Sequence, residues 1–206
     1  MFRNIMYNFN NNNMDIINTY NSLLKTGQIN VRCPKTYSFG TFEECRKHLY
    51  EAMQLVDKSA KIIWLNEYEE VAKWMSDTKG KGLLLTGNLG RGKTTILEAL
   101  NLLFRAKFNL VVTVHSSSSI RPTPELLKKW CYAVDEIGCE PMLNDYGTKY
   151  YPFMEFVNNA ERYLKLVLVT TNLTSTELRN KYDDRTVDRL TRLCYVVKFN
   201  GKSLRK

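Results

Sequence analysis

Residues 82–94 read GLLLTGNLGRGKT, and this stretch decides the fold class. A short apolar run at 82–86 leads into the pattern G-x-x-x-x-G-K-T, and a helical stretch follows from residue 94. The glycines let the backbone curl so that its N–H groups point at phosphate oxygens, and the N-terminal end of the helix adds positive potential. An ordinary glycine turn is the alternative. The strand–loop–helix context favours a phosphate-binding loop.

The loop supplies most of the predicted nucleotide-binding residues. The Lys93 ammonium can reach the β- and γ-phosphates, and the Thr94 hydroxyl can ligand Mg²⁺. The complete predicted set is Gly87, Asn88, Leu89, Gly90, Arg91, Gly92, Lys93, Thr94 and Thr95.

Four more apolar runs follow along the chain. They are predicted as strands at 110–114, 132–135, 166–171 and 195–199, and helical stretches lie at 94–106, 151–164 and 175–193. The runs are continuous rather than alternating, which is typical of strands buried on both faces. Strand–helix alternation of this kind predicts an α/β fold with a parallel sheet and helices on both sides.

Polar residues follow two of these predicted strands. Asp135 and Glu136 end the run WCYAV, where Asp135 can hold Mg²⁺ through water and Glu136 can orient and deprotonate an attacking water. Asn172 follows the run at 166–171 and can sense a phosphate or position that water. A turn residue that caps the next helix is the alternative for Asn172.

Three arginines, Arg185, Arg189 and Arg192, are spaced four and three apart, so a helix would place them on one face. One interpretation is a solvated basic face with Asp188 as a local partner. The other is an arginine finger that reaches the nucleotide of a neighbouring subunit. The residues alone leave these two level.

The N-terminal part has a different composition. Residues 1–13 form an asparagine-rich stretch that is predicted to be a disordered arm. Helical spacing covers 14–26, and Thr41 with Glu44 forms a capping box that begins a second helix. We expect residues 14–60 to be a small helical segment, which either packs on the body or docks a partner protein.

Composition and cysteine spacing argue against several classes of protein. The 206 residues carry a net charge of +9 and are 44% hydrophobic, which predicts one folded core and an anionic partner. The five cysteines include no C-x-x-C pair, and Cys33, Cys45 and His48 are too few and too poorly spaced for zinc. The apolar runs are far shorter than the roughly 18 residues of a membrane span, and no signal peptide begins the chain, so we expect a cytoplasmic protein without a membrane partner.

An ordered series of motifs carries a family resemblance. The motifs are GNLGRGKT, VDEIG at 134–138, YG at 146–147, ERY at 161–163, VTTNLTSTEL at 169–178, DDRTVDRL at 183–190 and FNGKSLR at 199–205. This series resembles the DnaC/IstB-like AAA+ ATPases over about 67–206. The resemblance implies a P-loop AAA+ three-layer sandwich over 61–206, with five parallel strands in the order 5-1-4-3-2 and no C-terminal lid domain.

The resemblance also implies chemistry. It implies an ATPase with ATP and Mg²⁺ bound between adjacent subunits, Thr94 and Asp135 at the metal, and a set of catalytic residues. That set is Lys93, Glu136, Asn172 and Arg185 as the finger, with Arg189 as second candidate. Residues 179–206 hold a net charge of +6, so part of the basic excess is assigned to nucleotide and subunit contact rather than to DNA.

The implied function is a DNA-replication accessory ATPase that loads or remodels a replicative helicase. The helicase contact is assigned to the N-terminal segment. Single-stranded DNA is a further partner in the family, although the short connection at 115–131 weakens that expectation here. Two alternatives stay open: an IstB-like transposition regulator, and a nucleotide-switched assembly module with little turnover.

Overall fold

The computed structural model describes residues 12–27, 33–58, 62–145 and 147–204. Contacts divide the chain into two compact units, which meet in sequence between Cys33 and Pro34. The first unit contains one described helix, α1 (Asn12–Lys25), which agrees with the helical spacing at 14–26. Eleven residues of the predicted arm, 1–11, lie outside the described residues. Three apolar side chains of α1 are exposed, namely Ile16, Ile17 and Tyr20.

A five-stranded parallel sheet forms the centre of the second unit. Its strands are β1 (Gly82–Gly87), β2 (Val114–Ser116), β3 (Cys131–Asp135), β6 (Leu166–Thr171) and β7 (Cys194–Phe199). The order across the sheet is β2-β3-β6-β1-β7, which is the implied order 5-1-4-3-2 when only these five are counted. The carboxyl ends of β1, β3 and β6 therefore meet at one edge, where ligands bind in open α/β sheets.

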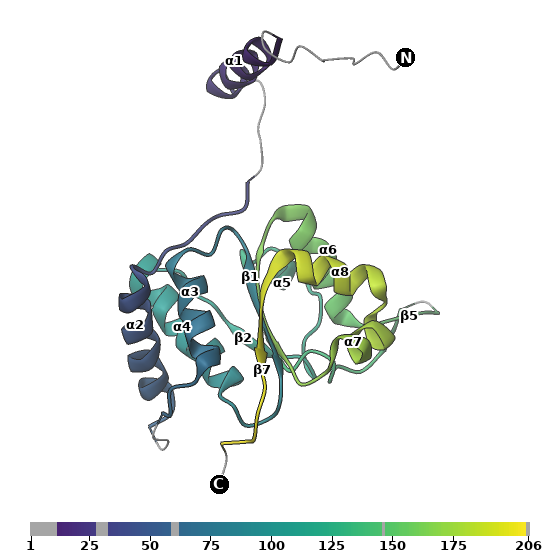
Figure 1. Ribbon diagram of the computed structural model, residues 1–206. Coiled ribbons are helices and arrows are strands. Elements are labelled where there is room, and N and C mark those ends of the chain that lie inside the picture. Colours follow the sequence, from purple (N-terminus) through teal and green to yellow (C-terminus); the bar gives the residue numbers. More distant parts are fainter. Residues whose placement is uncertain (1–11, 28–32, 59–61, 146, 205–206) are drawn as a thin grey trace, which may run out of the picture. The chain divides into compact units, whose positions relative to one another are not determined.

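Helices cover both faces of this sheet, as Figure 1 shows. The helices on one side are α2 (Phe42–Val56), α3 (Asn66–Ser76) and α4 (Lys93–Phe108). Those on the other side are α5 (Pro124–Leu127), α6 (Pro152–Tyr163), α7 (Ser175–Tyr182) and α8 (Asp184–Leu193). Leu83 and Leu85 of β1 enter the first core and Leu84 enters the second, because successive side chains of a strand point to opposite faces. The predicted three-layer architecture is confirmed.

Helix α2 belongs to the same compact unit as the phosphate loop. Its capping box is formed as predicted: the Thr41 hydroxyl accepts from the Glu44 N–H, and the Glu44 carboxylate accepts from the Thr41 N–H at 2.7 Å. The N–H and the hydroxyl of Thr41 both donate to this carboxylate and lower the pKa of Glu44. The apolar stripe of α2, with Cys45, Leu49 and Met53, is buried in the first core. The division after Cys33 thus differs from the expected boundary after residue 60, because α2 needs α3 and α4 to cover this stripe.

Two predicted elements have different bounds. The strand expected at 110–114 is found at 114–116. Helix α4 ends at a left-handed Asn109, and the buried Val112 packs in the first core, so this stretch uses its apolar side chains to close the end of α4. The Leu110 N–H donates to Phe104 O at 3.2 Å instead of to a strand.

The helix expected at 175–193 is two helices. Asp183 separates α7 from α8 with φ 88°, and its carboxylate accepts from the Thr186 N–H at 2.7 Å. An N-terminal cap within a helical run ends one helix and begins the next.

A hairpin of β4 (Leu143–Asp145) and β5 (Thr148–Tyr150) was not predicted, because these strands are short and lie mostly at the surface. Its turn includes Gly147 at φ 90°. Within the described ranges, no helix combines the length and apolar character needed to cross a bilayer.

Candidate functional site

The phosphate loop lies between the end of β1 and the start of α4. Gly87 and Gly92 have φ values of 119° and 82°, which side chains rarely allow. A Cβ on Gly87 would lie 2.3 Å from Phe199 O, and one on Gly92 would lie 2.6 Å from the Tyr68 hydroxyl. Both positions therefore require glycine for close packing as well as for backbone conformation. Helix α4 has no side-chain cap at its N-terminus, so its first N–H groups are left for a ligand.

Lys93 is the first residue of α4 and is only 7% exposed. Its ammonium donates to Gly87 O at 2.6 Å and to Asn88 O at 2.7 Å, so it bridges the loop from inside. This places a positive charge at the concave side of the loop, where phosphate oxygens would lie. The predicted position of Lys93 agrees with this geometry.

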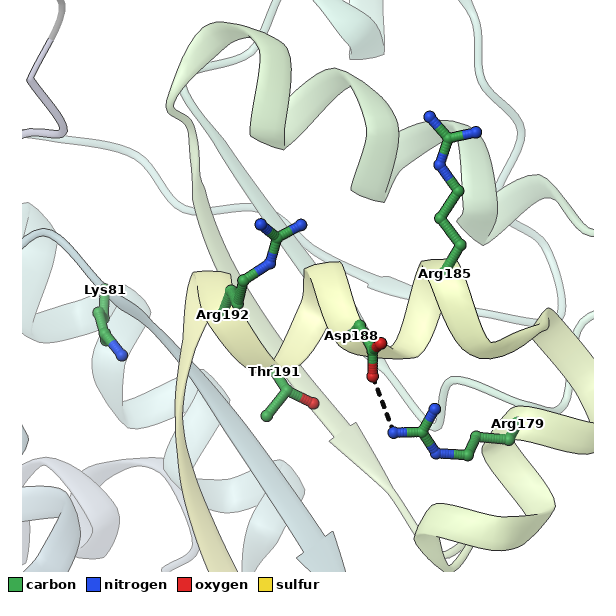
Figure 2. A pocket seen from close by; sticks show the side chains of 6 residues that line it. All are labelled: Lys81, Arg179, Arg185, Asp188, Thr191 and Arg192. Atoms are coloured by element: carbon green, nitrogen blue, oxygen red, sulfur yellow. Dashed lines mark hydrogen bonds and ion pairs between the residues drawn. The ribbon is translucent and has the colours of Figure 1, made fainter.

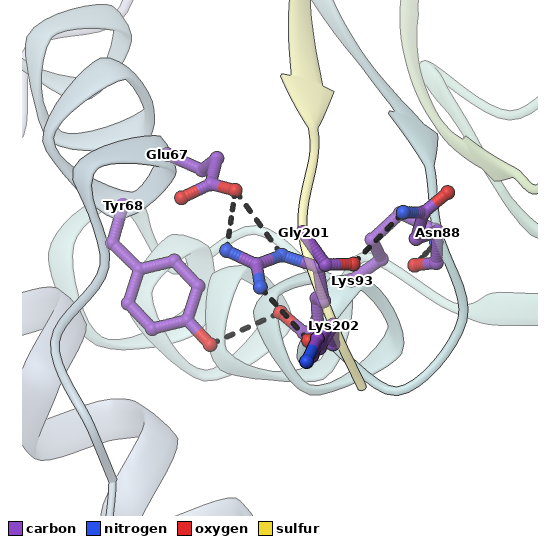
Figure 3. Close-up of polar contacts among 7 residues, drawn as sticks. Glu67, Tyr68, Asn88, Lys93, Gly201 and Lys202 are labelled. Atoms are coloured by element: carbon purple, nitrogen blue, oxygen red, sulfur yellow. Dashed lines mark hydrogen bonds and ion pairs between the residues drawn. The ribbon is translucent and has the colours of Figure 1, made fainter. Parts of the chain in front are cut away.

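Arg91 belongs to the predicted nucleotide-binding set, but its side chain contacts other parts of the protein. It is 8% exposed, and its guanidinium pairs with the Glu67 carboxylate of α3 at 2.6 Å and donates to Lys202 O at 3.0 Å. Its own carbonyl accepts from the Tyr68 hydroxyl at 3.1 Å. Burial raises the pKa of Tyr68 to about 12, so this hydroxyl stays protonated as a donor. Figure 3 labels the partners Glu67, Tyr68 and Lys202 of this network. The hydrogen bonds from Arg91 to Glu67 connect the loop to α3.

The segment after β7 crosses the same loop. The Asn88 side chain donates to Gly201 O at 2.8 Å, and the Leu204 N–H donates to Gly90 O at 2.9 Å. The Asn88 N–H also donates to Phe199 O at 2.9 Å. Sequence analysis did not find this contact. The only signal for it was the FNGKSLR motif, which served there as a mark of resemblance.

The predicted metal-binding pair, Thr94 and Asp135, lies beside the loop. The Thr94 hydroxyl is within 3.0 and 3.1 Å of the two Asp135 oxygens, so the two predicted metal residues are brought together. Thr170 of β6, which is 1% exposed, donates to Asp135 at 2.5 Å and accepts from the Glu136 N–H at 2.8 Å. Sequence analysis missed Thr170, because only strand pairing brings it between the two acidic residues.

Glu136 and Asn172 form the second pair at this edge. The Asn172 amide donates to Glu136 Oε1 at 3.2 Å, and Asn172 Oδ1 is buried with no hydrogen-bond partner. Glu136 itself is exposed and has φ 57°, a strained conformation that is typical of functional positions. The structure thus brings these two side chains together, and the Asn172 amide oxygen has no hydrogen-bond partner among the described residues.

These groups fit Mg²⁺ with a nucleotide. Mg²⁺ takes one or two protein oxygens and completes its octahedron with phosphates and water. Thr94 and Asp135 are such a set, and Lys93 stands on the phosphate side. Among the described residues, no group of three or more His, Cys, Asp or Glu is arranged to hold a metal by itself.

The arginine cluster lies elsewhere. Arg185 is exposed and lines a surface cavity together with Lys81, Arg179, Asp188, Thr191 and Arg192 (Figure 2). Arg189 instead pairs with Glu161 of α6 at 2.7 Å and donates to Asn158, and Arg192 pairs with Glu161 at 2.9 Å. Over the described part of the chain, no hydrogen bond or ion pair joins Arg185 to the phosphate loop.

Comparison with solved structures identifies the fold of this chain. No protein-family model and no curated protein matches the chain. Among solved structures, the DnaC helicase loader is 14% identical with a TM-score of 0.53, over 72% of this chain and 98% of that one. DnaI is 17% identical with a TM-score of 0.54, over 73% and 93%.

AMPPCP-bound DnaA from Aquifex aeolicus is also similar. It is 17% identical with a TM-score of 0.52, over 67% of this chain and 48% of that one. Identities this low show the fold alone, and the parallel sheet with its phosphate loop agrees with it. The chain therefore has the fold of the DnaC-like AAA+ ATPases.

Proposed function

We propose that this protein is a DnaC-like ATPase that binds and hydrolyses ATP and acts on a replicative helicase. One observation carries the proposal: the phosphate loop, the Thr94–Asp135 pair and the Asn172–Glu136 pair converge on one edge of the sheet. An isolated phosphate loop would support nucleotide binding only. The second pair adds a carboxylate and an amide at the place where a water would attack.

Binding is assigned to the loop and to α4. Backbone N–H groups of the loop and of the uncapped helix end face the phosphates, and Lys93 exchanges its two carbonyl partners for phosphate oxygens. Mg²⁺, held by Thr94 and by Asp135 through water, would neutralise charge on the phosphates. The Arg91 side chain stabilises the loop through Glu67 and is not assigned a contact with the nucleotide.

Hydrolysis is assigned to Glu136. Its carboxylate accepts a proton from a water molecule as that water attacks the terminal phosphorus. The bond from this phosphorus to the bridging oxygen breaks, and ADP and inorganic phosphate leave. Asn172 orients this carboxylate through the 3.2 Å hydrogen bond. Its unpartnered Oδ1 is placed to accept from the same water or to sense the phosphate.

The arginine finger is assigned to Arg185 and acts on the neighbouring subunit. Arg185 is exposed and lines a cavity, whereas Arg189 is held by Glu161. A finger must be able to leave its own subunit, and an arginine in a close ion pair cannot do so without losing it. The arrangement therefore favours Arg185 over Arg189 and a site shared by two copies of the chain.

The partner is proposed to be a replicative helicase bound through the N-terminal unit. The exposed Ile16, Ile17 and Tyr20 of α1 offer an apolar face to such a partner. The likeness to the DnaC helicase loader supports this class of partner. A pull-down with the full chain, ATP and Mg²⁺ should retain a helicase. Retention of a transposase alone would favour a transposition regulator instead.

The direct test of the chemistry is Glu136→Gln. We expect ATP affinity within about twofold of the wild type and a loss of turnover on the order of 10²-fold or more, since the amide cannot accept the proton. Glu98→Gln on the exposed side of α4 is the matched control and should hydrolyse normally. Normal turnover by Glu136→Gln would exclude Glu136 as the base. Normal helicase binding without any wild-type turnover would favour a nucleotide-switched module.

A further inference from the structure

A buried glutamate lies next to the Glu136 turn and takes no part in the chemistry above. Glu140 is only 2% exposed. Its Oε2 accepts from the Gly138 N–H at 2.9 Å, and its Oε1 accepts from the hydroxyl of Tyr182, the last residue of α7. Lys181 donates to the Glu140 carbonyl at 3.2 Å. A charged residue this deeply buried is retained only where its hydrogen bonds are needed.

One end of this turn is fixed to the catalytic edge of the sheet. The Ile137 N–H donates to Thr170 O at 2.9 Å, and the Thr171 hydroxyl donates to Ile137 O at 2.8 Å. Thr170 also contacts Asp135 and Glu136. Any shift of Glu136 on nucleotide binding is therefore passed to the turn 136–140.

The other end is fixed to the helix that carries Arg185. Tyr182 is 1% exposed, and it is followed directly by Asp183, the cap of α8. Burial and the nearby Glu140 charge both raise the pKa of Tyr182, so the hydroxyl remains a donor. Arg179 pairs with Asp184 at 2.6 Å and with Asp188 at 2.8 Å, so ion pairs connect the last turns of α7 to the start of α8.

We propose that the Glu140–Tyr182 hydrogen bond is a positioning link that couples the nucleotide site of a subunit to its own Arg185. Glu140 and Tyr182 are positioning residues in this scheme, because neither touches a nucleotide. The link fixes the position from which Arg185 reaches the nucleotide of the next subunit. The inference rests on the proposed ATPase function. It adds that nucleotide binding in one subunit changes the position of the Arg185 that acts on the next subunit.

The first test is hydrogen exchange on the full chain, at a dilution where light scattering shows a monomer. ATP with Mg²⁺ should slow exchange in 87–95 and also in α8, residues 184–193. In Glu140→Gln and Tyr182→Phe, ATP should still protect the loop, while the change in α8 is lost. Tyr151→Phe is the matched control, because the Tyr151 ring packs on Tyr182 and its hydroxyl makes no hydrogen bond within the described residues.

The second test separates a role in the subunit's own site from a role toward its neighbour. Tyr182→Phe should lower turnover by on the order of tenfold with an unchanged KM for ATP. Mixing it with Glu136→Gln should restore activity, because the Glu136→Gln subunit binds ATP without turnover and supplies a placed Arg185. Mixing it with Arg185→Ala should not, because neither subunit then supplies a placed arginine.

The opposite mixing pattern would overturn the inference and place the link in the subunit's own site. An α8 exchange rate that is the same with and without ATP in the wild type would also overturn it. The same conclusion would follow if ATP slowed α8 exchange in Tyr182→Phe as much as in the wild type. A wild-type chain that binds no ATP would instead overturn the proposed function. Where Glu140→Gln fails to fold, Tyr182→Phe keeps both tests decisive.

Discussion

At the scale of single residues, the candidate site depends on hydroxyls that hold its acidic groups. Thr170 contacts both members of the Asp135–Glu136 pair, and Thr94 contacts Asp135 from the other side. The acidic pair could be predicted from its place after an apolar run. Thr170 could not, because it lies on β6, and only the pairing of β3 with β6 brings it there.

Replacing Thr170 by valine keeps the shape of the side chain and removes both hydrogen bonds. We expect a loss of about 1–3 kcal/mol in the free energy of unfolding, since the Glu136 N–H loses its partner. Turnover should fall as well, because Asp135 and Glu136 lose their common anchor. Thr176→Val on exposed α7 is the control, and urea unfolding with an ATPase assay is the measurement. An unchanged unfolding midpoint would show that Thr170 does not hold the pair.

At the scale of elements, the sequence of α2 predicts where the helix begins but not what it packs against. Its start at Phe42 follows from the Thr41–Glu44 capping box. Its role does not follow, because an amphipathic stripe has the same pattern whether it packs on its own domain or on a partner. The structure buries this stripe against the first core, so the partner-docking proposal now depends mainly on α1.

Two leucines of α2 test this placement. Leu49 is fully buried and Leu55 is 65% exposed, so they form a matched pair on one helix. Leu49→Ala should lower the free energy of unfolding by about 2–5 kcal/mol through lost contacts and a cavity. Leu55→Ala should change it by less than about 0.5 kcal/mol. Equal effects in denaturant unfolding would contradict the packing of α2 in the core of the second unit.

At the scale of the whole second unit, three segments far apart in sequence meet at the phosphate loop. The Arg91 guanidinium pairs with Glu67 of α3 and donates to Lys202 O. The Asn88 side chain donates to Gly201 O. No local pattern links these segments. The fold brings them together because α3 lies beside β7, whose end continues across the loop.

Gly201→Ala tests this closure. Gly201 has φ 122°, and an added Cβ would lie 2.8 Å from the Arg91 guanidinium. Gly147→Ala is the matched control, with φ 90° and no atom within 4 Å of the added Cβ. Both variants carry backbone strain of about 1–2 kcal/mol, but only Gly201→Ala should weaken ATP binding, roughly threefold to tenfold for a loss of about one hydrogen bond. Titration with a fluorescent nucleotide measures this, and equal affinities would show that the tail does not shape the loop.

The sequence by itself determined the phosphate loop, the parallel sheet and the acidic strand end, because each depends on residues adjacent in the chain. Tertiary structure decided the rest. It moved β2 to 114–116, since 110–113 close the end of α4, and it split 175–193 at Asp183, whose side chain caps α8. It also placed Thr170, Arg91 and Glu140, because their partners lie on other strands and helices, and contacts of that kind leave no periodic trace in a single sequence.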